Sequence, residues 1–523
     1  MNELQDKKDA PDSNGKTSQS EAEKVAYGDK VTKLDFYMGS FGSAVPMLVF
    51  IGWAITLSIL LADFGAPDES GLILGVIAGL VAGLFLSRSS WSDYCQAIFD
   101  GLSQPVGVIA VVCWIWAGMF AKVLSAGGLV DGLVWLGGVT GFSGGSFVVT
   151  TFLLSAVFAT AVGTGYGTTI AFCELMFPAG IVLGADPVVL FAAILSGSAF
   201  GDNLAPVSDT TIVSAVTQET DVPGVVRSRF KYALAAAIPA MILFAIMGGG
   251  GAVDPARAET LMSGLANPAG LVLLIPFVLV IILAMTGRHI IVSITWGIIV
   301  AVGLILLSNL EPVANILGGP LAHPQAILAL DVDKRALTGA LVDGINGFIK
   351  MGILILFIVA AGHIMSLGGA LDGIKHAMMK IVRNSVRRAE VVIFGTVASL
   401  NAFITVNTAA EIAAAPFVSD MGKTFGLHPY RRANFLDAVS SAFGYIFPWS
   451  GGVLIGVATL QGLSGKYDFF TAPSPMEVWP YVFHGWFLAG VMLVAAITGF
   501  GRRFIGKNGL PVKTPVQSVE DAD

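Results

Sequence analysis

Two aspartates stand seven residues apart in an apolar stretch that has no basic residue nearby. Asp202 and Asp209 lie in the run GSAFGDNLAPVSDTT at residues 197–211, and no Lys or Arg occurs from Val123 to Val226. Buried carboxylates without a partner carry a large free-energy cost. We therefore expect a transported cation or a proton to supply the positive charge.

The same run predicts a broken helix. Asp202 and Asp209 would share one face of an unbroken helix, but Pro206 removes a backbone hydrogen bond and clashes with the preceding turn. A break frees backbone carbonyls beside the hydroxyl groups of the motif, and small hard cations such as Na+ prefer such oxygen ligands. A water-exposed loop is the alternative for both acids. The hydroxyl groups belong to Ser208, Thr210 and Thr211.

A second break is predicted upstream, in the run AVGTGYGTT at residues 161–169. Its three glycines and three threonines end an apolar span, which favours unwound backbone with Thr164 and Thr168 as oxygen ligands. The glycine spacing does not match a dinucleotide-binding loop, which needs a preceding strand and a βαβ setting. A flexible turn is the alternative interpretation.

The composition indicates what positions these residues. Of the 523 residues, 55% are hydrophobic and only 12% are charged, whereas soluble domains carry roughly 25% charged residues. Apolar segments long enough to span a bilayer recur along the chain and predict roughly 11 to 14 crossings, some of them broken. We expect an all-α polytopic membrane protein, and no basic patch points to nucleic acid.

Basic residues at the ends of the apolar segments predict the orientation. Lys30 and Lys33 precede the first span, and the turn at residues 62–70 carries only acids, so the N-terminus is expected inside. The C-terminus is expected inside for the same reason. Arg502, Arg503 and Lys507 are the basic residues that place the C-terminus inside. Two further inside loops are predicted at the basic groups Arg227, Arg229 and Lys231, and Lys375, Lys380, Arg383, Arg387 and Arg388.

Two halves of the chain resemble each other at a constant offset of 242 residues. The spacing Gly-x-x-Pro at 184–187 recurs at 426–429, and Pro206 matches Pro448. No basic residue follows Gly132 for a long distance, whereas five follow Gly373, so equivalent ends are expected to face opposite sides of the membrane. This predicts inverted-topology repeats with discontinuous transmembrane helices and re-entrant segments, the usual build of a secondary transporter. Chance similarity between glycine-rich apolar segments is the alternative.

These observations divide the chain into four parts. Residues 1–36 are predicted to be a disordered cytoplasmic tail, because they are polar and lack the apolar region of a signal peptide. Repeat one is expected at 37–250 with the motif 197–211, and repeat two at 251–500 with motifs at 401–411 and 447–452. Residues 501–523 are expected to form a cytoplasmic C-terminal tail.

The second repeat lacks the acid pair, since Gly444 and Gly451 stand where Asp202 and Asp209 stand in the first. An asymmetric site follows, with charge from repeat one and neutral oxygens plus one acid from repeat two. Arg431 and Arg432 either flank a turn or pair with Asp437. The second-repeat candidates are Asn401, Asn407, Glu411, Asp437, Ser440, Trp449 and Ser450.

The motif at 201–211 resembles the signature G-D-x-x-S-P-x-S-D-T-T of the NhaC-type sodium/proton antiporter family. The breaks at 163–169 and at Pro448-Trp449 are similar to two further elements of that family, and the resemblance covers roughly Leu72 to Phe500. It implies a member of the ion-transporter superfamily with inverted repeats and broken helices. The chain departs from the pattern at Asn203 and Ala205. The family includes relatives that move organic acids or amino acids, so fold does not determine substrate.

Two functions follow from the sequence. The first is Na+/H+ exchange by alternating access, with Na+ bound by ionised Asp202 and Asp209 and a proton bound when they are neutral. The second is Na+- or H+-coupled transport of a small organic acid or amino acid, with Arg431 or Arg432 as a partner of its carboxylate. No motif predicts an enzyme, and no cofactor is expected beside the transported ions. The predicted location is the cell membrane (a bacterial inner membrane), and a homodimer and an organic solute are left open as partners.

Overall fold

The computed structural model describes residues 31–60, 69–206, 208–251, 266–286, 288–333, 335–382 and 385–514. Residues 1–30 of the predicted N-terminal tail, residues 515–523 of the predicted C-terminal tail and Arg383 fall outside these ranges.

The first half of the described chain is helical throughout. Its helices are α2 (Ser40–Leu60), α3 (Glu69–Leu86), α4 (Trp91–Leu102), α5 (Pro105–Ala126), α6 (Leu129–Thr140), α7 (Gly144–Val162), α8 (Gly165–Val182), α9 (Pro187–Leu204), α10 (Asp209–Thr217) and α11 (Val222–Met247).

The second half adds two short antiparallel hairpins to its helices. The helices are η2 (Pro268–Leu273), α13 (Leu274–Met285), α14 (Ile290–Ser308), α15 (Glu311–Leu317), α16 (Pro324–Ile327), α17 (Ala340–Leu367), α18 (Ala370–Val382), α19 (Val386–Phe403), α20 (Asn407–Thr424), α21 (Pro429–Phe443), α22 (Gly451–Ser464), α23 (Pro475–Val478), η3 (Trp479–Tyr481) and α24 (Phe483–Thr498). The strands are β1 (Ala329–Asp331) with β2 (Ala336–Thr338), and β3 (Phe504–Ile505) with β4 (Pro511–Val512).

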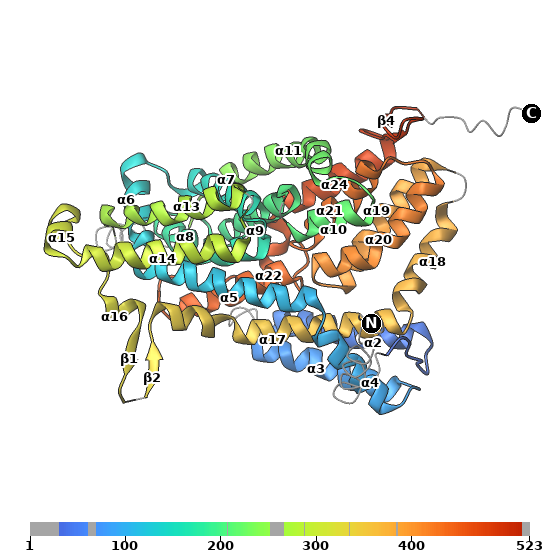
Figure 1. Ribbon diagram of the computed structural model, residues 1–523, viewed down its shortest axis with the longest axis horizontal. Coiled ribbons are helices and arrows are strands. Elements are labelled where there is room, and N and C mark those ends of the chain that lie inside the picture. Colours follow the sequence, from blue (N-terminus) through green and yellow to red (C-terminus); the bar gives the residue numbers. More distant parts are fainter. Residues whose placement is uncertain are drawn as a thin grey trace, which may run out of the picture.

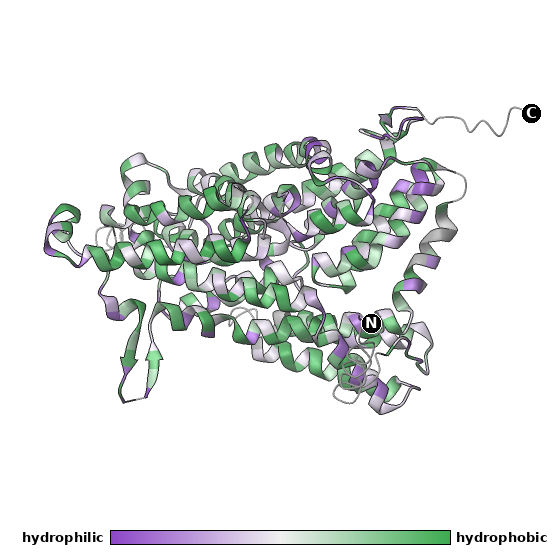
Figure 2. Cartoon of the chain, viewed as in Figure 1, coloured by the Kyte–Doolittle hydropathy of each residue, from purple (hydrophilic) through white to green (hydrophobic). Residues whose placement is uncertain are grey.

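The helices form an elongated bundle, with α15 and the β1–β2 hairpin at one end and α18 and β4 at the other (Figure 1). Hydrophobic residues dominate the body of the bundle (Figure 2). Among the described residues, eight helices are long and apolar enough to cross a membrane, or nine with the bent pair Pro475–Tyr481 and Phe483–Thr498. The predicted all-α polytopic fold is confirmed. The number is below the roughly 11 to 14 predicted crossings, because broken crossings leave short helices such as α22.

The helix boundaries repeat with the offset predicted from the sequence. Helices α8, α9 and α10 each begin 242 residues before α20, α21 and α22. The three pairs of first residues are Gly165 and Asn407, Pro187 and Pro429, and Asp209 and Gly451. The two halves therefore share one order of helices and breaks.

The equivalent helices α5 and α17 pack against each other in opposite directions. Gly107, near the start of α5, lies against Leu356 in the second half of α17, and Gly118, further along α5, lies against Gly344 near the start of α17. A Cβ on Gly344 would lie 2.5 Å from the Cα of Met119, so glycines permit this close approach. Antiparallel packing of equivalent helices is what inverted-topology repeats require.

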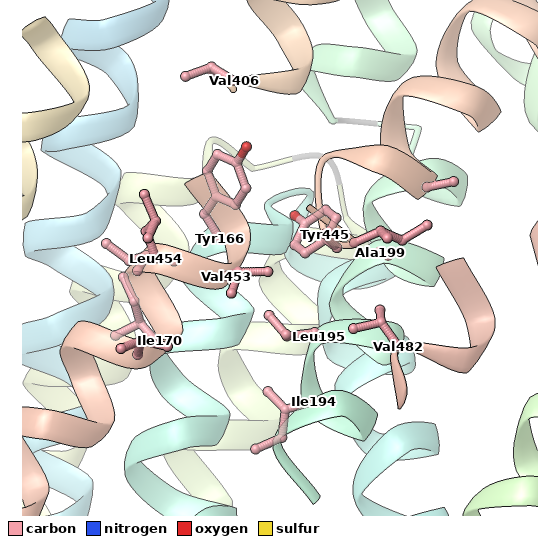
Figure 3. Packing of buried hydrophobic residues seen from close by; sticks show 14 of the residues in the cluster. Tyr166, Ile170, Ile194, Leu195, Ala199, Val406, Tyr445, Val453, Leu454 and Val482 are labelled. Atoms are coloured by element: carbon pink, nitrogen blue, oxygen red, sulfur yellow. The ribbon is translucent and has the colours of Figure 1, made fainter. Parts of the chain in front are cut away.

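Buried side chains from both repeats form one core around the helix breaks. Figure 3 shows Ile170 of α8 and Leu195 of α9 beside Val453 of α22, with Tyr166 and Tyr445 above them. The two tyrosine rings lie 5.5 Å apart between centroids. The core thus holds the break of one repeat against the break of the other.

Candidate functional site

Pro206 ends α9 and separates it from α10. The residue before a proline is disfavoured in the helical conformation, and Ala205 is extended with φ −70° and ψ 122°. The backbone becomes helical again at Asp209, with Ser208 in the extended N-cap conformation. Asp202 therefore lies in the last turn of α9, and Asp209 lies at the first position of α10.

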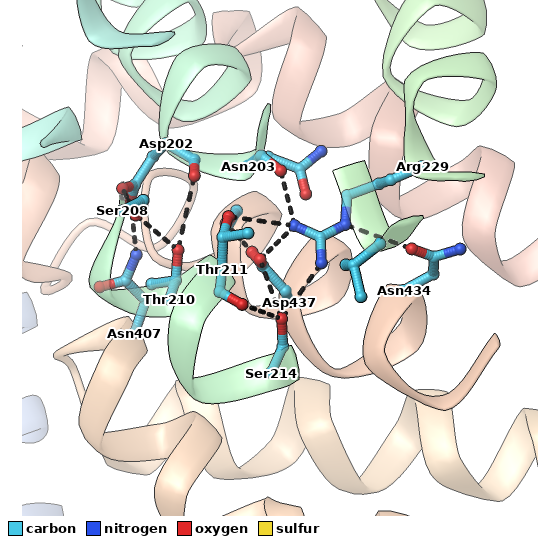
Figure 4. Close-up of polar contacts among 12 residues, drawn as sticks. Asp202, Asn203, Ser208, Thr210, Thr211, Ser214, Arg229, Asn407, Asn434 and Asp437 are labelled. Atoms are coloured by element: carbon cyan, nitrogen blue, oxygen red, sulfur yellow. Dashed lines mark hydrogen bonds and ion pairs between the residues drawn. The ribbon is translucent and has the colours of Figure 1, made fainter. Parts of the chain in front are cut away.

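The hydroxyl groups of the motif surround the two acids. The Ser208 hydroxyl donates to Asp202 Oδ1 at 2.8 Å and lies 2.9 Å from the Thr210 hydroxyl. The Thr210 amide donates to Asp209 Oδ1 at 3.0 Å. A helix N-terminus favours the negative charge of Asp209. Figure 4 shows Asp202, Ser208 and Thr210 pointing toward one another.

The start of α20, from the second repeat, contacts both acids. The Asn407 side-chain amide donates to Asp202 Oδ2 at 2.9 Å, and the Thr408 hydroxyl donates to Asp209 Oδ2 at 2.6 Å. The Tyr445 hydroxyl also donates to Asp202 Oδ2, at 3.2 Å. The acids of repeat one are therefore held by donors of repeat two.

Both acids line a cavity of about 390 Å³. Asp202 is only 3% exposed, whereas Asp209 is exposed to the cavity. None of the described residues that line it is a Lys or Arg, and His289, just before α14, is the basic side chain among these described residues. The lining residues are Val108, Ile109, Ala110, Val112, Cys113, Trp114, Gly163, Thr164, Gly165, Tyr166, Asp202, Asp209, Ile212, His289, Ile290, Ile291, Val406, Asn407 and Thr408.

A buried ion pair between Arg229 and Asp437 lies beside this site and was missed by the sequence reasoning. Both side chains are fully buried. The guanidinium also donates to the carbonyl of Asn203 at 2.6 Å and to the Ser214 hydroxyl at 3.2 Å (Figure 4). Arg229 thus joins the end of α9 and the start of α10 to α21 of the other repeat.

The prediction that Arg227, Arg229 and Lys231 lie in a loop was wrong, because all three lie in α11. Helix α11 begins at Val222 behind an Asp221 N-cap, so Arg229 lies two turns into the helix. Its face is shared with Val225, Tyr232 and Ala236, which are all buried. The capping residues followed by this spacing of apolar residues were the available signal.

Arg431 and Arg432 do not pair with Asp437, and neither of them lines the cavity. The Arg431 guanidinium donates to both oxygens of Glu390, at 2.8 and 3.1 Å, and Arg502 donates to Glu390 at 2.7 Å. Arg432 donates to the Gln218 carbonyl at 3.2 Å. These bases therefore tie helices together away from the acid pair and do not reach a solute in the cavity.

The remaining candidate residues differ in whether they line the cavity of the two acids. Thr164 caps α8 and lines the cavity, whereas the Thr168 hydroxyl bonds to the Thr164 carbonyl at 2.8 Å. Thr211 accepts from Arg229 at 3.5 Å, on the side of the Arg229–Asp437 pair. Trp449 does not line the cavity and donates to the Ala402 carbonyl at 2.9 Å.

Three second-repeat candidates lie behind the cavity. The Ser440 hydroxyl donates to Asn401 Oδ1 and to the Asn407 carbonyl, both at 3.0 Å. Among the described residues the Ser450 hydroxyl has no hydrogen-bond partner.

The described residues contain no group of three or more His, Cys, Asp or Glu side chains that could hold a metal ion. A cation at the acid pair would depend on two carboxylates and neutral oxygens.

Tyr445, which donates to Asp202, was not among the residues predicted from the sequence. Its position directly after Gly444, the counterpart of Asp202, was the available signal.

The sequence is similar to known transport proteins along most of its length. The sequence model of the Na+/H+ antiporter family matches residues 15–249 and 255–486, which confirms the predicted family resemblance. The chain is 26% identical to the malate-2H(+)/Na(+)-lactate antiporter of Bacillus subtilis (strain 168), over 82% of this chain and 96% of that protein. It is 25% identical to the arginine/ornithine antiporter ArcD of Halobacterium salinarum, over 86% and 92%. It is 28% identical to the Na(+)/H(+) antiporter NhaC of Alkalihalophilus pseudofirmus, over 44% and 50%.

Proposed function

The chain belongs to the Na+/H+ antiporter family, and from this premise we propose that it exchanges Na+ for H+ across the membrane by alternating access. The proposal rests on the position of Asp202 and Asp209 in one cavity, which has no Lys or Arg among the described residues that line it. Two carboxylates without a basic partner favour a bound cation or bound protons. Na+ and H+ then compete for the same oxygens.

The hydroxyl and amide groups around Asp202 and Asp209 are compatible with binding of either Na+ or protons. The Ser208 and Thr408 hydroxyls donate to the two carboxylates, and a hydroxyl that donates its hydrogen keeps lone pairs that can accept a cation. The Asn407 amide donates to Asp202. Na+ would take oxygens of the ionised pair and of these hydroxyls, and protons would replace it on the carboxylates.

We place the cavity mouth on the cytoplasmic side of the membrane. The start of α2 lies against the end of α17, where the Ser43 hydroxyl donates to the Met365 carbonyl at 3.4 Å. Val108 and Ile109 line the cavity from the first turns of α5, which begins near the same end. We assign the N- and C-termini to the cytoplasm of a bacterial cell, and on this assignment we infer an inward-open state. Rocking of one repeat against the other would then expose the acids to the other side.

Purified protein in liposomes tests this function. An outward Na+ gradient is expected to drive H+ into the liposome lumen, measured with an internal pH dye, and collapse of the gradient should stop the signal. Empty liposomes control for leakage. Absence of Na+-driven H+ movement at every pH tested would contradict the proposal.

A second candidate is coupled transport of a small organic solute. The cavity of about 390 Å³ is much larger than a bare cation requires, and its walls are mostly apolar, with Trp114 and Ile212 among them. Such walls suit an organic body. The names of two relatives, a malate-2H(+)/Na(+)-lactate antiporter and an arginine/ornithine antiporter, also favour organic solutes. Since Arg431 and Arg432 lie elsewhere, an anionic solute would have to enter together with its cation.

A solute screen separates the two candidates. Na+ uptake is measured in the same liposomes with and without candidate organic acids and amino acids. Pure exchange predicts that no solute changes the rate, whereas stimulation by one solute, with counterflow of the labelled compound, would favour the second candidate.

A further inference from the structure

Glu411 is a buried acid without a partner. Its side chain is fully buried on α20, and within the described part of the chain neither carboxylate oxygen has a hydrogen-bond partner. An ionised carboxylate in such a place carries a large desolvation cost. The neutral acid is the form that this environment tolerates.

The other buried acids of the described ranges all have cationic or hydrogen-bonding partners. Glu174 pairs with Lys122 at 3.0 Å, and Glu390 pairs with Arg431 and Arg502. Asp437 pairs with Arg229, and Asp202 accepts hydrogen bonds as described above. Glu411 therefore differs from them in what surrounds it, and not only in burial.

The counterpart of Glu411 in repeat one shows how the position is normally satisfied. At the offset of 242 residues that counterpart is Thr169, whose hydroxyl bonds to the Gly165 carbonyl at 3.1 Å and to Ser198 at 3.0 Å. The serine equivalent to Ser198 is Ser440, which is bonded to Asn401 and Asn407 instead. The second repeat thus has the carboxyl of Glu411 where the first has the hydroxyl of Thr169, and Ser440 does not donate a hydrogen bond to that carboxyl.

Glu411 lies next to the groups that hold the cavity acids. It follows Asn407 by four residues and Thr408 by three, so all three side chains lie on one face of α20. Asn407 and Thr408 donate to Asp202 and Asp209. Movement of α20 that releases the acids would therefore also move Glu411.

The charges around Glu411 disfavour its ionisation in this state. The charged groups that act on it are Asp437 of α21, Arg229 of α11, Asp209 of α10 and Asp202 of α9. Three of the four are acids, and Arg229 is already bonded to Asp437. Among these four groups no unpaired cation is left for an ionised Glu411.

We propose that Glu411 is a second proton-binding site of the exchanger, separate from the cavity pair, and that it carries one additional proton in each transport cycle. The carboxyl group holds its proton in the conformation described here and releases it to water when the core opens to the other side. Only the O–H bond forms and breaks. This inference rests on the proposed exchange of Na+ for H+.

The number of protons moved per Na+ tests the proposal. It is measured in liposomes from the membrane potential at which Na+-driven H+ flow reverses. Glu411→Gln is expected to transport with one proton fewer per Na+ than the wild type. Glu411→Asp keeps a carboxyl, and Asp420→Asn removes an exposed acid from the same helix; both should keep the wild-type ratio. An unchanged ratio in Glu411→Gln would overturn the proposal.

Infrared spectroscopy gives a readout that does not need transport. At saturating Na+ the cavity pair is ionised, so the absorption of a protonated carboxyl should remain in the wild type and in Asp420→Asn and be lost in Glu411→Gln. Equal absorption in Glu411→Gln would contradict the inference even if that variant is inactive. A wild type without Na+-driven H+ movement would instead contradict the proposed function, and the infrared signal would still decide the protonation of Glu411.

Discussion

The α9–α10 crossing and the α21–α22 crossing have the same backbone plan and opposite electrostatics. Each is a helix, a proline-containing break and a second helix, with Pro206 and Pro448 at equivalent positions. The first carries Asp202 and Asp209 on either side of its break, whereas the second carries Gly444 and Gly451. The pseudo-symmetric fold therefore holds a site that is not symmetric.

The two glycines leave room for a partner of Asp202 and for a cavity-lining tyrosine. A Cβ on Gly444 would lie 3.0 Å from the Cβ of Asn407, the residue that donates to Asp202. A Cβ on Gly451 would lie 3.1 Å from the hydroxyl of Tyr166, a cavity-lining residue. A side chain at either glycine would crowd Asn407 or Tyr166, so the second crossing has a steric reason for glycine where the first carries its acids.

Removing the cation that joins the two crossings is expected to have the largest effect on stability. Arg229→Met leaves Asp437 buried and unpaired, so it should destabilise the folded protein by about 3–5 kcal/mol. Thermal unfolding in detergent, followed by tryptophan fluorescence, measures the loss. The double variant Arg229→Met/Asp437→Met is expected to recover most of it, and a double variant as unstable as the single one would show that the pair is not the cause.

The equivalent serines of the two crossings offer a matched test of the asymmetry. The Ser208 hydroxyl donates to Asp202, whereas the Ser450 hydroxyl has no partner among the described residues. A hydrogen bond to a charged group contributes about 1.5–3 kcal/mol, so Ser208→Ala should raise the Na+ concentration for half-maximal transport by roughly tenfold or more. Ser450→Ala should change it by less than about twofold. Equal changes of this Na+ concentration in the two variants would contradict a functional difference between the two crossings.

The N-caps of α9 and α21 also differ, and this difference predicts a smaller, pH-dependent effect on the stability of the folded protein. Asp186 caps α9, and its counterpart His428 caps α21, accepting from the Tyr430 amide at 3.2 Å. Burial lowers the pKa of His428 below its usual value. As the pH falls below about 6.5, the unfolded chain therefore binds a proton that the folded protein excludes, and stability decreases.

His428→Asn keeps a capping side chain and removes this titration. Its melting temperature should fall less than that of the wild type between about pH 7.5 and pH 5.5. Parallel pH profiles of the two proteins would show that His428 does not contribute.

Local features of the sequence were sufficient for the plan of the fold. Pro206, with Gly197 and Gly201 beside it, predicted the break between α9 and α10, and the offset of 242 residues follows from residue types alone. The helix starts at Gly165 and Asn407 therefore repeat as predicted. The smaller number of full-length spans reflects breaks that leave helices such as α21 and α22 too short to cross a membrane alone.

The partners of the acids could not be derived in the same way. Arg229 reaches Asp437 over a separation of 208 residues, and Thr408 reaches Asp209 over 199. Such contacts depend on how the two repeats pack, which no local pattern encodes. Arg431 shows the same limit, since its pairing with Glu390 depends on the placement of α19 beside α21.

Proton release on Na+ binding tests the central claim most directly. Calorimetric titration of the purified protein with Na+, in buffers of different protonation enthalpy, counts the protons released per bound ion. We predict that the wild type and the surface control Asp420→Asn release protons as Na+ binds, and that Asp202→Asn/Asp209→Asn neither binds Na+ nor releases protons. Na+ binding by the wild type without proton release, or wild-type behaviour of the double variant, would contradict competition at Asp202 and Asp209.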